Sequence, residues 1–236
     1  MLADLASRFV SRLKGNQYSI DPTIGGGYLL RVITTRLAMK LRGVARTRQG
    51  VDSPFIGAGV QIRAKSKIKF GKNVTLDQGS FVDAQSVGGV SLGDNVTLGR
   101  GSRIECTGSL KLVGVGFTAG SNVGLGTDNF YGAAGGIEIG PDTIVGNFTS
   151  FHSENHVSED LATPIRLQGV VREGIRIGAN CWIGARVTVL DGVILGDGSI
   201  VAAGAVLKAG NYTENGIYAG VPARLVRSRG VIPFEV

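Results

Sequence analysis

The sequence has few of the residues that most catalytic and metal-binding motifs require. It contains two cysteines and two histidines among 236 residues. Cys106 and Cys181 show no CxxC spacing and no paired framework, which favours a reduced, cytoplasmic setting. Two histidines cannot supply the three ligands of a histidine-bound catalytic zinc ion, so we expect no metal cofactor.

Aromatic residues make up only 6% of the chain, and no apolar run approaches the roughly 18 residues that span a bilayer. Residues 1–14 also lack the apolar region and cleavage site of a secretory signal. A hydrophobic content of 43% argues against disorder. With 38 glycines and 6 prolines, the composition predicts many tight turns around a narrow aliphatic core. The net charge of +7 favours an anionic ligand or surface without choosing one.

What the chain does contain is a repeat with a period of six residues. An aliphatic residue opens each hexad of the second half, and a small or β-branched residue occupies the fifth position. These hexads begin at Ile177, Ile183, Val189, Leu195 and Val201. The same register appears upstream, in hexads that begin at Ile56, Ile62, Phe70, Leu92, Leu98, Ile139 and Val145.

A single hexad cannot bury its own aliphatic residue, but short strands stacked into a three-sided prism can. The alternative, a β-sandwich, would show period-two alternation with turns about every 8–12 residues. A steady period of six fits that alternative poorly. The sequence therefore predicts an all-β fold, a parallel β-helix of hexapeptide repeats.

The hexads resemble those of the hexapeptide-repeat acyltransferases, most closely sugar O-acetyltransferases of the maltose and galactoside type and their relatives in polysaccharide biosynthesis. The resemblance covers residues 55–227. It implies a left-handed prism, a homotrimer with its active site between subunits, and acetyl-CoA as co-substrate. The implied reaction is O-acetylation of a sugar or glycan hydroxyl, in surface polysaccharide biosynthesis. An amino-sugar N-acetyltransferase, or another small-molecule acyltransferase on this fold, is the alternative.

The repeat is interrupted by a polar segment, residues 151–174, which contains both histidines. Long loops on a rigid scaffold are usually functional or disordered. In the family that the chain resembles, the histidine that acts as general base ends a coil just before such a loop. Counting from Gly140 places His156 at that site and makes His152 a wall residue or a neighbour that positions the loop. An imidazole suits this role because it titrates near neutral pH. Asp128 and Asn129 are the expected contacts to the acceptor hydroxyl.

Small side chains are expected where the pantetheine arm of the cofactor lies along the coils. This prediction includes Gly184, Ala185 and Ala203, together with Trp182, which could instead be a prism-corner residue. The segment Ala219-Gly-Val-Pro-Ala-Arg224 resembles the closing element of the family. Its basic residues are expected to bind the cofactor phosphates, because guanidinium groups form bidentate forks. The residues concerned are Arg224 and Arg227, with Lys208 from the last coil.

The chain divides by pattern into three parts. Residues 1–50 are expected to form an amphipathic helical segment, with helices over 2–13 and 28–41, and residues 51–227 the β-helix. Residues 228–236 are a tail. We expect a cytoplasmic location. Basic amphipathic helices can contact anionic membranes, so these helices have two alternatives: peripheral membrane contact, or packing against the prism or another subunit. We expect no nucleic-acid partner, because the basic residues lie at the two ends without an aromatic stacking platform.

Overall fold

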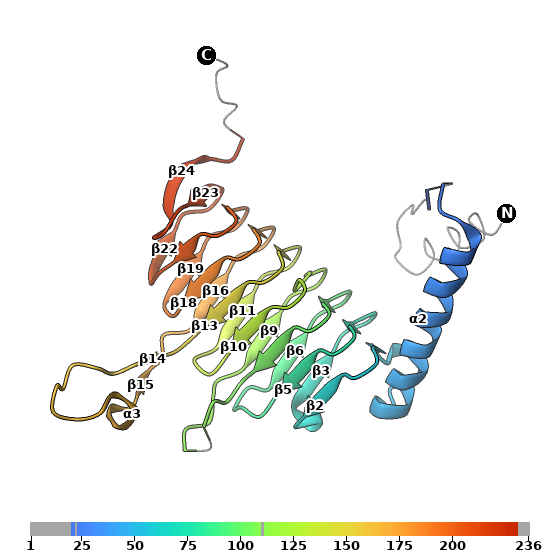
Figure 1. Cartoon of the computed structure of the whole chain (residues 1–236), viewed down its shortest axis with the longest axis horizontal. Coiled ribbons are helices and arrows are strands. Elements are labelled where there is room, and N and C mark those ends of the chain that lie inside the picture. Colours follow the sequence, from blue (N-terminus) through green and yellow to red (C-terminus); the bar gives the residue numbers. More distant parts are fainter. Residues whose placement is uncertain (1–19, 22, 110, 231–236) are drawn as a thin grey trace, which may run out of the picture.

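The computed structural model describes residues 20–21, 23–109 and 111–230. It is a three-sided stack of parallel coils, preceded by one long helix (Figure 1). Three faces run the length of the stack, and neighbouring coils are joined by parallel hydrogen-bonded strands. The predicted left-handed parallel β-helix is confirmed. The helix expected over residues 2–13 lies outside the described residues.

The strands of the three faces follow one another in rotation, with two exceptions on face A. Between β9 and β10 this face has only the bridge residue Gly124, and at its end β24 pairs antiparallel with β23. Face A contains β1 (Phe55–Ile56), β4 (Thr75–Leu76), β7 (Thr97–Leu98), β12 (Ile144–Val145), β17 (Trp182–Ile183), β20 (Ile200–Val201), β23 (Gly216–Ala219) and β24 (Arg224–Ser228). Face B contains β2 (Gln61–Arg63), β5 (Phe81–Asp83), β8 (Arg103–Glu105), β10 (Phe130–Gly132), β13 (Ser150–His152), β18 (Thr188–Leu190) and β21 (Val206–Leu207). Face C contains β3 (Ile68–Phe70), β6 (Val90–Leu92), β9 (Phe117–Ala119), β11 (Ile137–Ile139), β16 (Ile175–Ile177), β19 (Val193–Leu195) and β22 (Gly210–Tyr212).

The elements outside the faces are few. They are α2 (Gly26–Thr47), the 3₁₀ turns η1 (Gly50–Asp52) and η2 (Lys65–Lys67), the hairpin strands β14 (Asn155–His156) and β15 (Val170–Val171), and the short helix α3 (Ile165–Gln168). β14, α3 and β15 form an arm that projects away from the coils (Figure 1).

The corner between faces C and A explains part of the hexad pattern. Asn73, Asn95, Asn122 and Asp142 occupy this corner in successive coils, all with a positive φ. Asparagine and aspartate tolerate this conformation better than other non-glycine residues. Their side chains also form a ladder, in which Asn95 donates to Asn122 and Asn122 to Asp142, each at 2.9 Å. The fourth hexad position thus supplies both the turn and a bond between coils.

The prism axis is mainly aliphatic, with Tyr218 in the core near the C-terminal end. At the middle of the axis three buried rings pack together. Tyr131 packs edge-on against Phe117 at a centroid distance of 5.4 Å and lies over Phe151 at 5.0 Å. The Tyr131 hydroxyl donates to the Leu125 carbonyl at 2.8 Å, and burial raises the pKa of this phenol. The expectation of a purely aliphatic core was wrong at this level, because larger rings fill the axis beside the coils that carry the long loops.

Two insertions interrupt the coils, where the sequence analysis expected one. The predicted interruption leaves face B after β13 and returns to face C at β16. A second insertion lies two coils earlier, between β8 and β9, over residues 106–116. It was missed because it has no histidine and is short. The signal was present, since the hexad register is lost between Glu105 and Phe117.

Helix α2 covers the first coil with its cations. Arg42 Nε donates to the Ile56 carbonyl at 2.8 Å, and Arg46 Nη1 donates to the Val60 carbonyl at 2.9 Å. Gly43 lies between them, where a Cβ would be 1.8 Å from the Pro54 carbonyl oxygen. The first coil has no coil beneath it, so these guanidinium groups satisfy carbonyls at the open end of the stack.

We expect Arg42→Ala and Arg46→Ala each to lower the free energy of unfolding by about 1–3 kcal/mol, since each removes a charged donor from a partly buried carbonyl. Urea denaturation measures the change. Arg31→Ala, on the exposed shoulder of the same helix, is the control and should have almost no effect. Equal stabilities of all three variants would contradict this account of the helix.

The apolar side chains of α2 mostly face away from the prism. Leu30, Ile33, Leu37 and Leu41 are 44–63% exposed, whereas Leu29 is buried. No helix within the described residues has the length and apolar content to cross a membrane. Peripheral membrane contact through this helix stays a prediction.

Candidate active site

A groove runs across face A of the C-terminal coils, at the corner with face B. Its volume is about 710 Å³. Four of the predicted cofactor residues line it, namely Trp182, Gly184, Ala185 and Ala203. The apolar part of the wall also includes Ile144, Val145, Ile200, Val201 and Ala202. This volume is within the usual range for small-molecule sites, roughly 300–1,000 Å³.

Trp182 and Gly184 hold their positions for different reasons. The indole lies on an outward-facing position of β17 and is 55% exposed, so it lines the groove. Gly184 lies directly against the next coil, where a Cβ would be 2.5 Å from the Ala203 nitrogen. The small residue therefore allows the close approach of two coils beside the groove.

The predicted phosphate-binding arginines lie at the end of the same sheet. Trp182 pairs with Ile200, Ile200 with Ile217, and Ile217 with Arg227. Residues in register on neighbouring strands point to the same side of a sheet. Arg224, on the same strand β24 as Arg227, pairs with Ala219 of β23. Both arginines are exposed. Both cations therefore lie on the same face as the groove, on β24, two strands beyond the groove's last lining strand β20.

Lys208 lies elsewhere. It follows β21, in the position that continues the register of Thr188 with Val206 and Val189 with Leu207, and so lies beside Leu190 on face B. This is the edge of face B opposite the groove. The structure therefore does not bring Lys208 together with Arg224 and Arg227, because the chain has already crossed face B when it reaches this lysine.

The two histidines lie on face B and on the arm. His152 ends β13, where it pairs with Leu190, and its ring lies 5.7 Å from that of Phe130. His156 lies in β14, paired with Val170 of β15 in an antiparallel ladder. Both rings are exposed. The expectation that His156 ends the coil just before the loop was wrong, because His152 occupies that position at the end of β13 and His156 lies within the loop, on β14. The general-base role of His156 stays a prediction.

None of the acidic neighbours in the arm accepts a hydrogen bond from His156 within the described part of the chain. Glu154 is bound to Arg172, and the Glu159 carboxylate accepts from the Ser158 amide at 2.9 Å. Asp160 is held by Thr163 and the Ala162 amide, which lower the pKa of its carboxyl. The imidazole is therefore presented to solvent without an orienting carboxylate from its own arm.

Asn129 is committed to the coil and does not face a substrate. It is 2% exposed, its amide donates to the carbonyls of Leu125 and Gly146, and its oxygen accepts from the Thr149 amide. The expected acceptor contact by Asn129 thus has no geometric basis, because all its polar atoms are paired inside the corner. Asp128 is exposed at the same corner, on the groove side of face B, with φ of 54°.

Neither cysteine offers a reactive thiolate. Cys106 is completely buried, and burial raises the pKa of its thiol to about 12. Burial also raises the pKa of the Cys181 thiol, which is 2% exposed. Because the thiolate is the nucleophilic form, a covalent acyl-cysteine step is disfavoured.

The groove and the histidines lie at opposite edges of face B. In one coil the chain passes the groove at Ala185, crosses the face through β18, and reaches Leu190 beside His152. The arm with His156 leaves from this second edge and projects away from its own coils (Figure 1). Within a single chain, therefore, the groove and His156 do not face each other.

Comparisons with known proteins agree with the repeat and the fold. The family model described as bacterial transferase hexapeptide, six repeats, matches residues 174–209. A probable acetyltransferase of Mycobacterium tuberculosis is 30% identical over 110 residues, which is 47% of this chain and 36% of that protein. The chain thus spans about a third of the length of this curated relative.

Similar solved structures include AntD, an N-acyltransferase from Bacillus cereus, in complex with dTDP and coenzyme A. Its D94N variant matches with a TM-score of 0.55 and 20% identity, over 72% of this chain and 84% of that one. Another AntD variant, bound to dTDP-4-amino-4,6-dideoxyglucose and coenzyme A, gives 0.51 and 18%, over 78% and 88%. The resemblance to the hexapeptide-repeat transferases is therefore confirmed in the repeat and in the fold of the chain.

Proposed function

We propose that this protein is an acetyl-CoA-dependent O-acetyltransferase that acts on a sugar or glycan hydroxyl, with His156 as general base. The observation that carries the proposal is the groove. It is lined mainly by apolar and small side chains, and Arg224 and Arg227 lie farther along the same sheet. An apolar groove with two guanidinium groups farther along the same sheet fits a ligand with a flexible arm and a phosphorylated end. The hexapeptide transferase repeats at residues 174–209 support the same reaction class.

The chemistry assigns one step to His156. A sugar hydroxyl is a weak nucleophile, and the imidazole takes its proton as the oxygen attacks the thioester carbonyl. A carbon–oxygen bond forms, the carbon–sulfur bond breaks, and the proton passes from the imidazole to the departing sulfur. No cysteine intermediate is required, which agrees with the buried thiols of Cys106 and Cys181.

The reaction also requires a second copy of the chain. We propose a homotrimer in which the arm of one subunit reaches the groove of the next. The apolar residues Leu161, Ile165 and Leu167 of the arm are 54–99% exposed, as is Phe148 at 57% on the groove side of face B. Contact between subunits would bury them, and a closed ring of three needs only one kind of heterologous contact.

The direct test of the function is a panel of sugars, nucleotide sugars and amino sugars, each incubated with the protein and acetyl-CoA. Release of the free thiol is followed with time. The proposal expects acceleration by an acceptor whose reactive group is a hydroxyl. Acceleration only by acceptors with a free amine would favour the N-acetyltransferase, as in the substrate class of AntD. No acceleration by any acceptor would oppose both. Placement in surface polysaccharide biosynthesis follows if glycans of that class are the best acceptors.

Replacing Arg224 and Arg227 together with alanine is expected to raise the KM for acetyl-CoA at least about tenfold. Each guanidinium–phosphate bond contributes about 1.5–3 kcal/mol. The KM for the acceptor should change little, since the acceptor does not touch these residues. Arg176→Ala, on face C and paired only loosely with Glu138 at 3.9 Å, is the control. If a dephosphorylated cofactor loses affinity equally in wild type and double variant, the phosphate role is wrong.

A further inference from the structure

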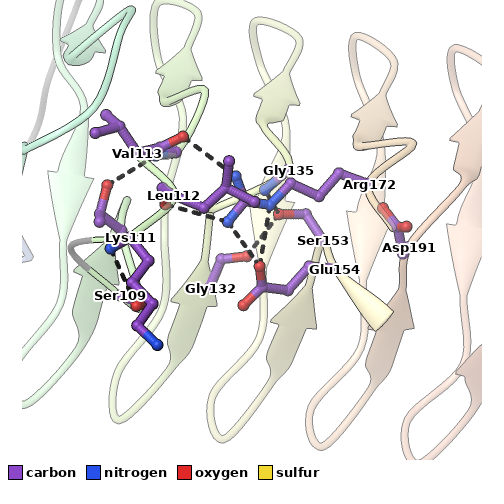
Figure 2. Close-up of polar contacts among 12 residues, drawn as sticks. Ser109, Lys111, Leu112, Val113, Gly132, Gly135, Ser153, Glu154, Arg172 and Asp191 are labelled. Atoms are coloured by element: carbon purple, nitrogen blue, oxygen red, sulfur yellow. Dashed lines mark hydrogen bonds and ion pairs between the residues drawn. The ribbon is translucent and has the colours of Figure 1, made fainter. Parts of the chain in front are cut away.

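The base of the arm is fastened by one arginine (Figure 2). Arg172 Nε and Nη2 lie 3.1 and 3.0 Å from Glu154 Oε2. Its other donors reach the second insertion, with Nη1 at 3.2 Å from the Val113 carbonyl and Nη2 at 3.5 Å from that of Leu112. One side chain thus joins both ends of the arm to a different loop.

The position of this contact in the ladder is what links it to His156. His156 pairs with Val170 and Asn155 with Val171. Glu154 and Arg172 are the next residues on the two strands, so their ion pair closes the hairpin two residues from the imidazole. Only two residues on each strand separate the clamp from the free part of the arm.

The remaining bonds at the root of the arm hold only its ends. The buried Asp191 carboxylate accepts from the Glu173 and Gly174 amides at 2.7–3.1 Å, and Ser153 Oγ donates to the Gly132 carbonyl at 2.7 Å. These bonds fix where the arm leaves and rejoins the prism. They do not fix the direction in which β14 and β15 project.

The second insertion lies on the other side of the clamp. Thr107 Oγ1 accepts from the Gly114 amide at 2.9 Å, which closes the loop that presents the carbonyls of Leu112 and Val113. Gly108 faces the same carboxylate, since a Cβ there would be 3.5 Å from Glu154 Oε1. The two insertions therefore meet around one ion pair.

Arginine suits this site and lysine does not. The Arg172 side chain is only 15% exposed, and its partner Glu154 is 31% exposed. A planar guanidinium can serve a carboxylate and two carbonyls at once, whereas an ammonium group is a single point of charge. Removing the guanidinium would leave a partly buried carboxylate and two carbonyls without their donor.

We propose that Arg172 is a positioning residue, which fixes the direction of the His156 hairpin against the second insertion, so that the two loops form one wall of the acceptor site. The expected effect of Arg172 on catalysis rests on the proposed function. Its expected effect on the orientation of the hairpin depends only on the contacts within this chain. The two parts are therefore tested by separate measurements.

The kinetic experiment compares Arg172→Met and Arg172→Lys with the control Arg166→Met. Arg166 is exposed on α3 of the same arm. Misplacement of a reacting group by about 1 Å can cost on the order of 100-fold in rate. We expect Arg172→Met to lower kcat about 10–100-fold with the KM for acetyl-CoA within about twofold of wild type. The lysine variant should recover only part of the loss, and the control should match wild type. A full recovery with lysine, or an equal rise in KM without loss of kcat, would overturn the proposal.

The structural experiment follows the histidine signals by NMR and needs no acceptor. The chain has two histidines, so a protein labelled at the histidine rings gives two signals, and His152→Gln identifies each. Arg172→Met should shift or broaden the His156 signal and leave that of His152 in place. Glu154→Gln, a smaller change at the same pair, should move the His156 signal in the same direction. An unmoved His156 signal in folded Arg172→Met protein would refute the positioning role, whatever the activity. A moved signal in a protein with no transferase activity would keep the positioning role and count against the proposed function.

Discussion

His156→Ala should lower kcat about 10²–10⁴-fold, because the variant removes the group that takes the proton from the acceptor hydroxyl. The fold should be unaffected, since the imidazole is exposed and its strand is held through backbone pairing with Val170. Steady-state kinetics with acetyl-CoA and the best acceptor measure the first effect. Thermal unfolding measures the second.

His152→Ala is the matched control. This residue is also an exposed histidine, but it lies on the wall, where its ring contacts Phe130. Its removal should cost much less activity than removal of His156. The reverse ranking would show that His152 is the base, and near-full turnover of the His156 variant would refute the assignment.

The second large effect concerns assembly. A chain with His156→Ala and a chain with Ala203→Trp, which fills the groove, should each be nearly inactive alone. Mixed after subunit exchange in equal amounts, they should regain about one quarter of wild-type activity. Three quarters of randomly assembled trimers are mixed, and about one site in three of each mixed ring combines an intact arm with an intact groove. Light scattering establishes the trimer before the mixing.

A third chain carrying both substitutions provides the control for this experiment. Mixed with His156→Ala subunits it cannot supply an intact imidazole, so no activity should return. Activity of a proven monomer would oppose the shared site. So would the absence of recovery between the two single variants after exchange has been demonstrated by mass.

The repeat made the faces and the groove predictable from the sequence. Hexads place an aliphatic residue on the axis at fixed intervals, so the alignment of Gly184 with Ala202 and of Ala185 with Ala203 follows from counting. The closing segment could be recognised because Arg224 and Arg227 follow a local motif. Local motifs and fixed periods depend only on residues that are close together in the sequence, so they can be read from one sequence.

Contacts between distant segments were not predictable in this way. The amide of Asn129 is used inside the corner, because Gly146 of the next coil lies within reach of it. The cations of α2 face the prism because the first coil leaves carbonyls unpaired at its open end. The clamp at Arg172 joins residues 59 or 60 positions apart. Each of these contacts depends on which segments become neighbours in the folded chain, and no local sequence pattern predicts that.

The central claim is best tested by following the acetyl group itself. The protein is incubated with acetyl-CoA carrying an isotopically labelled acetyl group and with the acceptor selected from the panel, and the product is examined by mass spectrometry and NMR. The account predicts labelled acetyl on a hydroxyl oxygen of the acceptor, formed by the wild-type protein and nearly absent with His156→Ala. Labelled acetyl on nitrogen, or equal yields from both proteins, would contradict it.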